Sequence, residues 1–328
     1  MKKSPLPLIL LVLVTGSVLR AEGAPGPRPY PAELVQKVEQ LRGQVLARGG
    51  SFQVGLNPAL QYDRERLCGT RIDLIPGEYL AHEPGGFENY ELQEPLATLP
   101  RTYVGFFSGV KDQGQCGSCW AFSTIGTLEG AVLKRNGAAH GTIGADGSIL
   151  PSGSLPSLSE EQVLSCNPWG WACNGGYFAF DMLMPAKAGR SGYYKGAVPT
   201  SAFPYVADAV ACSLGRNPTY TPVTRWGYVA GSRSVPSVAA IKSAIYTYGG
   251  VSACVYADDT FAAYTGGVFS DPTSYSTINH AILLVGWDDA RGAWLLKNSW
   301  GPRWGVDGFM WIKYGTCNVG LGACWALS

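Results

Sequence analysis

The chain has 328 residues, of which 46% are hydrophobic and 15% are charged. Globular proteins typically carry about 25% charged residues, so this composition excludes an intrinsically disordered chain. Lys and Arg total 25 against 24 Asp and Glu, which gives a net charge of +1. This balance argues against a nucleic-acid-binding protein, which typically carries an excess of basic residues. The length predicts about two domains, or one domain with an appended segment.

The first residues have the pattern of an export signal. Lys2 and Lys3 precede an apolar run from Leu6 to Leu19, which is shorter than the roughly 20 residues that span a bilayer. We predict that residues 1–22 are a signal peptide and that no membrane anchor remains after its removal. Export permits disulfides, but the nine cysteines are an odd number, so at least one must stay outside any internal pair.

Two segments of different character follow the signal. Apolar residues recur at helical spacing between residues 34 and 45 and predict a short amphipathic helix that ends at Gly49-Gly50. Prolines and glycines interrupt the stretch 51–100. We expect this stretch to be extended and to lie on another part of the molecule.

From residue 99 onward, a helical half precedes a sheet-rich half. Ser118 is a candidate cap for a helix that runs to about Arg135 with apolar residues on one face, and residues 136–157 are predicted to form a loop. Four apolar runs predict strands at 251–256, 280–285, 293–297 and 308–314. A cleft between two such halves is a natural place for a functional site.

The most specific string in the chain, from Gln113 to Ser123, reads QGQCGSCWAFS. Cys119 falls in the first turn of the predicted helix, where unpaired backbone N–H groups and the helix dipole favour a thiolate, the nucleophilic form of cysteine. Two other interpretations are a structural pair between Cys116 and Cys119 and a redox-active Cys-x-x-Cys motif. A base elsewhere in the chain would favour the nucleophile.

His280 is the candidate base. The other two histidines lie in the irregular segment and in the predicted loop, whereas His280 opens the apolar strand HAILLVG. If this strand and the next form a hairpin that turns near residue 289, Asn298 lies opposite His280. Opposed residues point to the same face of a sheet, so the Asn298 carboxamide can accept the imidazole N–H and determine which ring nitrogen faces Cys119.

Three strings together resemble the papain family of cysteine peptidases: the string around Cys119, NHAILLVGW around His280 and KNSWGPRWGVDGFMWI around Asn298. The resemblance covers roughly residues 99–328. It implies an α+β, papain-like two-lobed fold, with a helical lobe, an antiparallel β-barrel-like lobe and the active-site cleft between them. By this resemblance Cys119 is the nucleophile and His280 is the general base and then acid. Asn298 orients the histidine, and Gln113 is a donor of the oxyanion hole.

The same resemblance supplies candidate substrate-binding residues. A glycine pair would offer backbone hydrogen bonds to an extended peptide, because another backbone can approach glycine closely. The aromatic residue that follows would line the pocket for the second residue before the cut. Uncharged residues surround that pocket, including Ala253, Cys254 and Gly322, so we expect an apolar preference there. The candidate substrate-binding residues are Gly175, Gly176, Tyr177, Asn279, Trp300 and Trp304.

The resemblance also implies a cysteine pairing. Two disulfides would tie the loops around the cleft, Cys116–Cys173 and Cys166–Cys212. Three cysteines of the sheet-rich half then have no assigned partner, and one option is a bridge between the last two of them: Cys254, Cys317 and Cys324.

Residues 51–70, SFQVGLNPALQYDRERLCGT, resemble the propeptide of cathepsin B in the Phe-Gln-x-Gly start and the closing Leu-Cys-Gly-Thr. This implies that residues 23–97 are an inhibitory propeptide that covers the cleft, with Cys68 and Gly69 near the nucleophile, and that residues 98–328 are the peptidase domain. The insertion with paired histidines that makes cathepsin B trim dipeptides is absent from the corresponding part of the sequence, so we expect an endopeptidase.

The sequence as a whole predicts a monomeric, exported cysteine peptidase made as a zymogen, in an extracellular, periplasmic or lysosome-like compartment. Its expected partners are protein or peptide substrates and its own propeptide, without nucleic acid. No metal-ligand cluster stands out, and no cofactor is expected. A catalytically silent papain-like protein that binds peptides is the alternative, but the presence of Gln113, Cys119 and His280 favours the enzyme.

Overall fold

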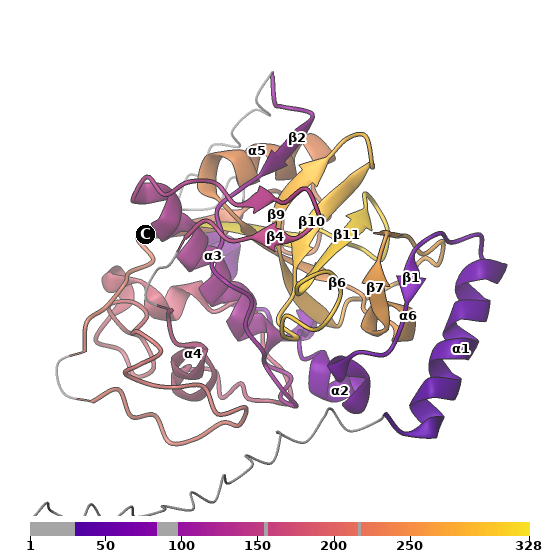
Figure 1. The fold of residues 1–328 in the computed structure, drawn as a ribbon. Coiled ribbons are helices and arrows are strands. Elements are labelled where there is room, and N and C mark those ends of the chain that lie inside the picture. Colours follow the sequence, from indigo (N-terminus) through magenta and orange to yellow (C-terminus); the bar gives the residue numbers. More distant parts are fainter. Residues whose placement is uncertain (1–29, 84–97, 154–156, 216–217) are drawn as a thin grey trace, which may run out of the picture.

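The computed structural model describes residues 30–83, 98–153, 157–215 and 218–328. The predicted signal peptide lies outside the described residues. Two lobes form the molecule (Figure 1): one is built on α3 (Cys119–Arg135) and α4 (Glu160–Cys166), and the other on the strands of the C-terminal half. This confirms the predicted α+β fold with a helical lobe and a sheet-rich lobe.

One eight-stranded sheet organises the second lobe. Its order is β5-β12-β6-β9-β10-β11-β8, with β2 also paired to β9. Every pairing is antiparallel except that of β11 with β8. All four predicted strands are present, and α5 (Val238–Tyr248) packs on the sheet. The strands are β2 (Thr102–Val104), β5 (Arg225–Tyr228), β6 (Val251–Val255), β8 (Val268–Phe269), β9 (His280–Asp288), β10 (Ala293–Lys297), β11 (Phe309–Lys313) and β12 (Leu321–Leu327).

The helix α3 is the central helix of its lobe, packs against β6, β9 and β12 of the other lobe, and is buried on all sides from Cys119 to Leu133. The expectation of a single apolar face was therefore too narrow, because the sheet covers the face that would otherwise meet water. Gly130 permits the close approach: a Cβ atom there would lie 2.7 Å from the carbonyl oxygen of Phe106. The loop predicted at 136–157 contains a short hairpin of β3 (Thr142–Ile143) and β4 (Ile149–Leu150).

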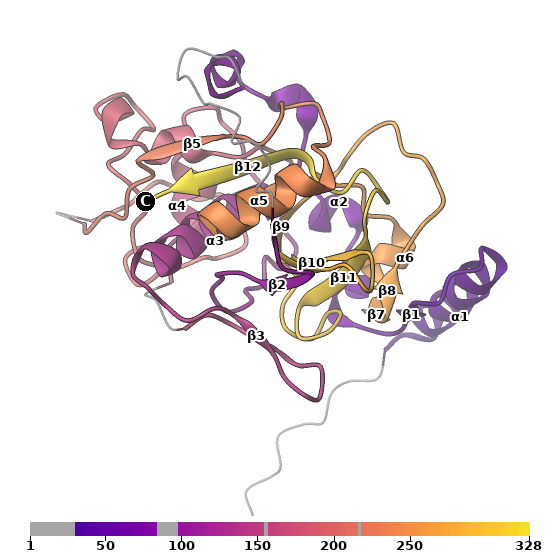
Figure 2. The same ribbon diagram turned by 90° about the horizontal axis from the view of Figure 1, so that it is seen from above.

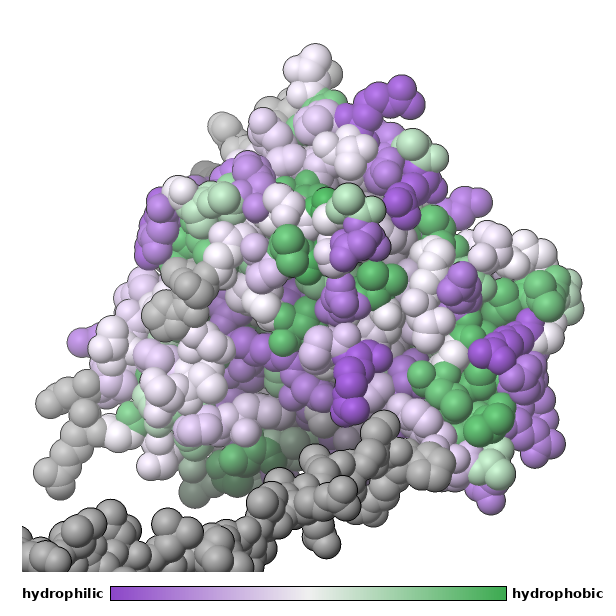
Figure 3. Space-filling view, viewed as in Figure 1, coloured by the Kyte–Doolittle hydropathy of each residue, from purple (hydrophilic) through white to green (hydrophobic). Residues whose placement is uncertain are grey.

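The N-terminal segment crosses from the sheet lobe to the helical lobe. The predicted helix is α1 (Ala32–Ala47), which buries Val38, Leu41 and Val45. The next strand, β1 (Gln53–Val54), pairs with β7 (Tyr264–Gly266) beside α6 (Asp259–Ala262) (Figures 1 and 2). Hydrophobic residues gather on the surface over this end of the molecule (Figure 3). The segment continues through η1 (Pro58–Gln61), α2 (Arg64–Leu67), η2 (Ile72–Leu74) and η3 (Gly77–His82).

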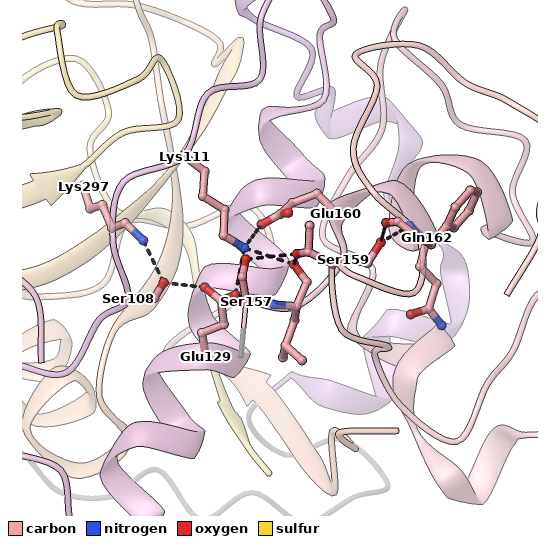
Figure 4. A network of polar contacts seen from close by, with 11 residues as sticks. Ser108, Lys111, Glu129, Ser157, Ser159, Glu160, Gln162 and Lys297 are labelled. Carbon is pink, nitrogen blue, oxygen red and sulfur yellow. Dashed lines mark hydrogen bonds and ion pairs between the residues drawn. The ribbon is translucent and has the colours of Figure 1, made fainter. Parts of the chain in front are cut away.

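A buried network of charged side chains joins the two lobes (Figure 4). The Lys111 ammonium lies 2.8 Å from the Glu129 carboxylate of α3 and also pairs with Glu160 of α4. From the sheet lobe, the Lys297 ammonium donates to Ser108 Oγ at 3.2 Å, and this hydroxyl donates to Glu129. Burial lowers the pKa of Lys297 to about 8. Because Lys297 is the last residue of β10, the network ties the end of this strand to the helical lobe.

Candidate active site

Cys119 is the first residue of α3 and is fully buried in this form of the protein. Helix N–H groups at such a position lack intrahelical partners and favour an anion. Ser118 precedes the helix, but its hydroxyl pairs with Tyr205 Oη at 2.7 Å and does not cap the helix. Burial by itself would raise the pKa of the Cys119 thiol, but the charge of His280 and the Thr70 hydroxyl outweigh it and lower the pKa to about 7.

His280 opens β9 and is also fully buried. Its Nε2 lies 2.8 Å from Asn298 Oδ1, so Nε2–H donates to the carboxamide, as the sequence predicts. Nδ1 makes no hydrogen bond to any other described residue, which leaves this nitrogen for the Cys119 sulfur. The Trp300 ring covers the imidazole at a centroid distance of 4.6 Å.

The route by which Asn298 reaches His280 differs from the predicted one. The ladder between β9 and β10 pairs Ala293 with Asp288 and Lys297 with Leu283, so Asn298 does not lie directly opposite His280. The turn centre lies further along the chain than residue 289, and the register shifts between Leu295 and Leu296. Asn298 follows the last paired residue of β10, and its side chain reaches His280 from beyond the end of the ladder.

Gln113 faces the same site from the loop before α3. Its Nε2 donates to Cys116 O at 2.7 Å and to Leu67 O at 3.0 Å, and its Oε1 accepts from Ser299 Oγ at 2.6 Å. The Trp300 indole N–H also reaches Leu67 O, at 3.3 Å. A carbonyl of the N-terminal segment therefore rests on the amide that the sequence assigns to the oxyanion hole.

Residues 67–71 of the N-terminal segment fill the cleft. Gly69 N–H and Thr70 Oγ1 lie 3.3 and 3.1 Å from Cys119 Sγ. Gly69 O accepts from Gly176 N–H at 2.9 Å, and Arg71 N–H donates to Gly176 O at 3.0 Å. Glycine is required at position 69, because a Cβ atom there would lie only 1.7 Å from the carbonyl oxygen of Gly117.

The other predicted contact residues take different positions. Thr70 N–H donates to the backbone carbonyl of Asn279 at 2.9 Å, whereas the Asn279 side chain bonds the backbone of Ala257. Cys68 is half-buried, and burial together with the nearby Cys119 raises the pKa of its thiol. Trp304 is fully buried behind Trp300, with ring centroids 5.3 Å apart.

Of the remaining substrate-binding candidates, Gly175 and Gly176 face the segment in the cleft, whereas Tyr177 is buried in the core. Gly175 has a φ of +139°, which favours glycine, and a Cβ atom there would meet the Arg71 side chain at 2.8 Å. A Cβ atom on Gly176 would clash with the Trp120 ring at 2.5 Å. The Tyr177 ring is fully buried, and its hydroxyl would lie 2.5 Å from a Cβ atom on Gly322.

Two functional contacts were missed at the sequence level. Thr70 bonds the Cys119 sulfur, and Ser299 holds the Gln113 carboxamide. Both residues stand inside strings that the sequence singles out, Thr70 directly after Gly69 and Ser299 directly after Asn298. Only their position beside Gly69 and Asn298 could have indicated a role in the site, because a single Ser or Thr outside a helix or strand belongs to no periodic sequence pattern.

The cysteines divide into two disulfides and five thiols. The structure contains Cys116–Cys173 and Cys166–Cys212, the two pairs that the resemblance implies. The first of these rules out a Cys116–Cys119 pair in this form. The bridge between Cys317 and Cys324 is not formed, and both are buried thiols, as is Cys254. Burial raises the pKa of these three thiols, whereas the pKa of Cys119 is lowered, which distinguishes Cys119 chemically from the rest.

The lowered pKa predicts a thiolate that forms near neutral pH. The ultraviolet absorbance of the thiolate, taken as the difference between the zymogen and its Cys119→Ala variant, should appear as the pH rises through about 7. An ordinary cysteine would titrate at about 8.5. His280→Ala should move the midpoint to higher pH, because it removes the charge that stabilises the thiolate. A midpoint that His280→Ala leaves in place would contradict the assigned pairing.

The described residues contain neither a candidate metal site nor a helix that could span a membrane. No group of three or more His, Cys, Asp or Glu side chains in the described part of the chain could hold a metal ion. None of the described helices is both long enough and apolar enough to cross a membrane.

Comparison with known proteins agrees with the geometry. The model of the papain family cysteine proteases matches residues 98–327. Pro-cathepsin H of Bos taurus is 29% identical over 296 residues, which cover 85% of this chain and 77% of that protein.

Two solved structures share the fold. Digestive procathepsin L2 proteinase from the larval midgut of Tenebrio molitor has a TM-score of 0.71 and 25% identity, with 90% of each chain covered. Bromelain protease from Ananas comosus, solved in complex with the E64 inhibitor, has a TM-score of 0.55 and 27% identity over 70% of this chain and 99% of that one. The chain belongs to the papain family of cysteine proteases.

Proposed function

We propose that the protein is an exported zymogen of an endopeptidase that cleaves peptide bonds through a thioester on Cys119. The observation that carries the proposal is that Asn298, His280 and Gln113 all direct their side chains to the site of the Cys119 sulfur. The Asn298 carboxamide holds Nε2 of His280, Nδ1 is left for the Cys119 sulfur, and the Gln113 amide already binds a carbonyl oxygen beside them.

The chemical steps follow from these positions. The Cys119 thiolate attacks the carbonyl carbon of the substrate, and the developing oxyanion accepts hydrogen bonds from Gln113 Nε2 and backbone N–H groups. The C–N bond then breaks as His280 gives its proton to the leaving amine. In the second half, His280 takes a proton from water, which attacks the thioester and releases the acid and the free thiol. Asn298 keeps the imidazole oriented throughout.

The division of the chain is part of the proposal: residues 1–22 as signal, 23–97 as propeptide and 98–328 as peptidase domain. The contacts of residues 67–71 with Cys119, Gly176 and Gln113 support an inhibitory role for the segment before residue 98. The likeness of residues 51–70 to the cathepsin B propeptide supports the same role. In this segment, the Gly69 N–H group and the Thr70 hydroxyl lie against the Cys119 sulfur. Neither group offers a carbonyl carbon that the sulfur could attack, as expected of a segment that blocks the cleft.

The proposed specificity is an apolar residue at the second position before the cut. Tyr177 and Gly322 lie against each other, and the thiols of Cys254 and Cys324 nearby stay neutral because burial raises the pKa of both. No charge on these four residues would attract a lysine or arginine of the substrate.

Digestion of an unstructured protein by the processed enzyme tests the proposed function. We expect cuts at internal bonds, with apolar residues enriched two positions before each cut when the products are sequenced by mass spectrometry. A product series made only of C-terminal dipeptides would refute the endopeptidase assignment, and arginine dominating the second position would refute the apolar pocket. A catalytically silent peptide-binding protein would yield no new products.

A further inference from the structure

The end of the N-terminal segment carries a fully buried aromatic side chain. Tyr79 in η3 is 0% exposed, and its hydroxyl donates to the carbonyl oxygen of Phe178 at 2.7 Å. Its ring meets Trp226 edge-on at 4.9 Å and Trp169 at 6.0 Å. Trp226 stands in β5, an edge strand of the sheet, but its side chain belongs to the core of the helical lobe. The helical lobe thus surrounds the Tyr79 ring with aromatic side chains and accepts the hydrogen bond of its hydroxyl. Tyr79 is therefore inserted into a pocket of that lobe.

His82 enters the same pocket one turn later. The 3₁₀ geometry of η3 brings residues three apart onto one face, so Tyr79 and His82 point the same way. The imidazole is 0% exposed and stacks on Trp226 at 4.0 Å, with Nε2 3.0 Å from Asp181 Oδ1. The Asp181 side chain is also 0% exposed, and it pairs with Lys187.

Polar contacts surround this pocket at the surface. The Glu83 carboxylate accepts from Ser232 N–H at 3.0 Å and from the Ser232 hydroxyl. The Tyr193 hydroxyl donates to Glu78 Oε1 at 3.0 Å. The pocket therefore recognises a tyrosine, a histidine three residues later and a carboxylate directly after it, and η3 lies against β5 (Figure 2).

The contacts at the cleft are of another kind. Residues 67–71 are held mainly through backbone groups, on the cleft residues Gln113, Gly176 and Asn279. Between the two sets of contacts, the side chains of Arg71 and Asp73 are exposed and pair with each other, whereas Ile72, Leu74 and Ile75 pack partly buried against the core of the helical lobe. The two attachments differ in chemistry, because backbone groups dominate at the cleft and side chains dominate at residues 77–83.

We propose that the helical lobe carries a second peptide-binding site, separate from the cleft, which holds residues 77–83 independently of the contacts at Cys119. We call these residues the anchor segment. The cleft can then open while the anchor segment stays bound.

Hydrogen exchange on the full-length zymogen tests this independence, with Cys119→Ala throughout to prevent self-cleavage. In this background Gly69→Leu should increase exchange at the amides of Thr70 and Arg71, while residues 77–83 keep their protection. Tyr79→Ala should have the reverse effect and lower protection in the anchor segment by more than about tenfold, because a buried aromatic ring is lost.

Leu80→Ala is the matched control, since Leu80 sits beside Tyr79 in the same turn but is 64% exposed, and it should leave both segments unchanged. Tyr79→Phe is a milder second variant, because it removes only the hydroxyl that bonds Phe178 O and keeps the ring. Its loss of protection in the anchor segment should lie between those of the unmodified protein and Tyr79→Ala, which keeps the test valid if Tyr79→Ala unfolds the lobe. Amides of β9 and β10 report whether each variant remains folded. Loss of protection in both segments together, in either variant, would overturn the proposal, as would a Tyr79→Ala protein that behaves like Leu80→Ala.

Discussion

His280→Ala is expected to lower kcat/KM of the processed enzyme by about 10⁴-fold, a magnitude typical of removing a base that acts as a unit with its nucleophile. Without the imidazole, the Cys119 thiol loses the charge that lowers its pKa and the leaving amine loses its proton donor. The measurement is hydrolysis of a fluorogenic peptide by variants brought to the same processed form with an added protease.

His140→Ala is the control for this prediction. His140 is an exposed histidine whose Nδ1 lies 3.1 Å from the carbonyl oxygen of Val104, remote in sequence from the catalytic strings. Its replacement should leave kcat/KM within about twofold, as surface substitutions generally do. Equal losses in the two variants would mean that the effect of His280→Ala is structural and not chemical.

Gly69→Leu is expected to release the cleft of the zymogen. No side chain fits at position 69, because its Cβ atom would lie 1.7 Å from Gly117 O, so the segment must lift away from Cys119. Overpacking of this kind costs about 1–3 kcal/mol, which corresponds to about a 5- to 150-fold larger open fraction. Alkylation of Cys119 by iodoacetamide in the intact zymogen should accelerate by that factor.

Gly43→Ala serves as the matched control, because Gly43 lies in α1 with nothing within 4 Å of the added Cβ atom. Its alkylation rate should equal that of the unmodified zymogen. Should Gly69→Leu also leave the rate unchanged, residues 67–71 would not be the element that blocks the cleft.

The sequence predicts most of the candidate site because the proposed catalytic residues stand in long, specific strings. Cys119, His280 and Asn298 meet as expected, yet the predicted hairpin register was wrong. A register shift between Leu295 and Leu296 leaves no mark in a continuous apolar run, because such runs look the same in any register. Asn298 is not paired with His280 across the two strands. Its side chain reaches His280 because Asn298 lies just beyond the last paired residue of β10.

Other features depend on tertiary contacts that no local pattern carries. The full burial of α3 comes from strands more than 100 residues away, so the apolar stripe revealed only one of its faces. His82 stands in a segment broken by prolines, and nothing in its neighbourhood indicates that Trp226 and Asp181 receive it. The thiols of Cys317 and Cys324 illustrate the same point, since pairing depends on geometry that sequence spacing does not give.

The mass of the processed protein after exposure to E-64 tests the central claim most directly, namely that Cys119 is an activated nucleophile in a papain-type site. We predict one inhibitor molecule per chain, located on Cys119 by peptide mapping, with complete loss of peptidase activity and no label on the buried thiols of Cys254, Cys317 and Cys324. A processed, folded protein whose Cys119 remains unlabelled would contradict the account.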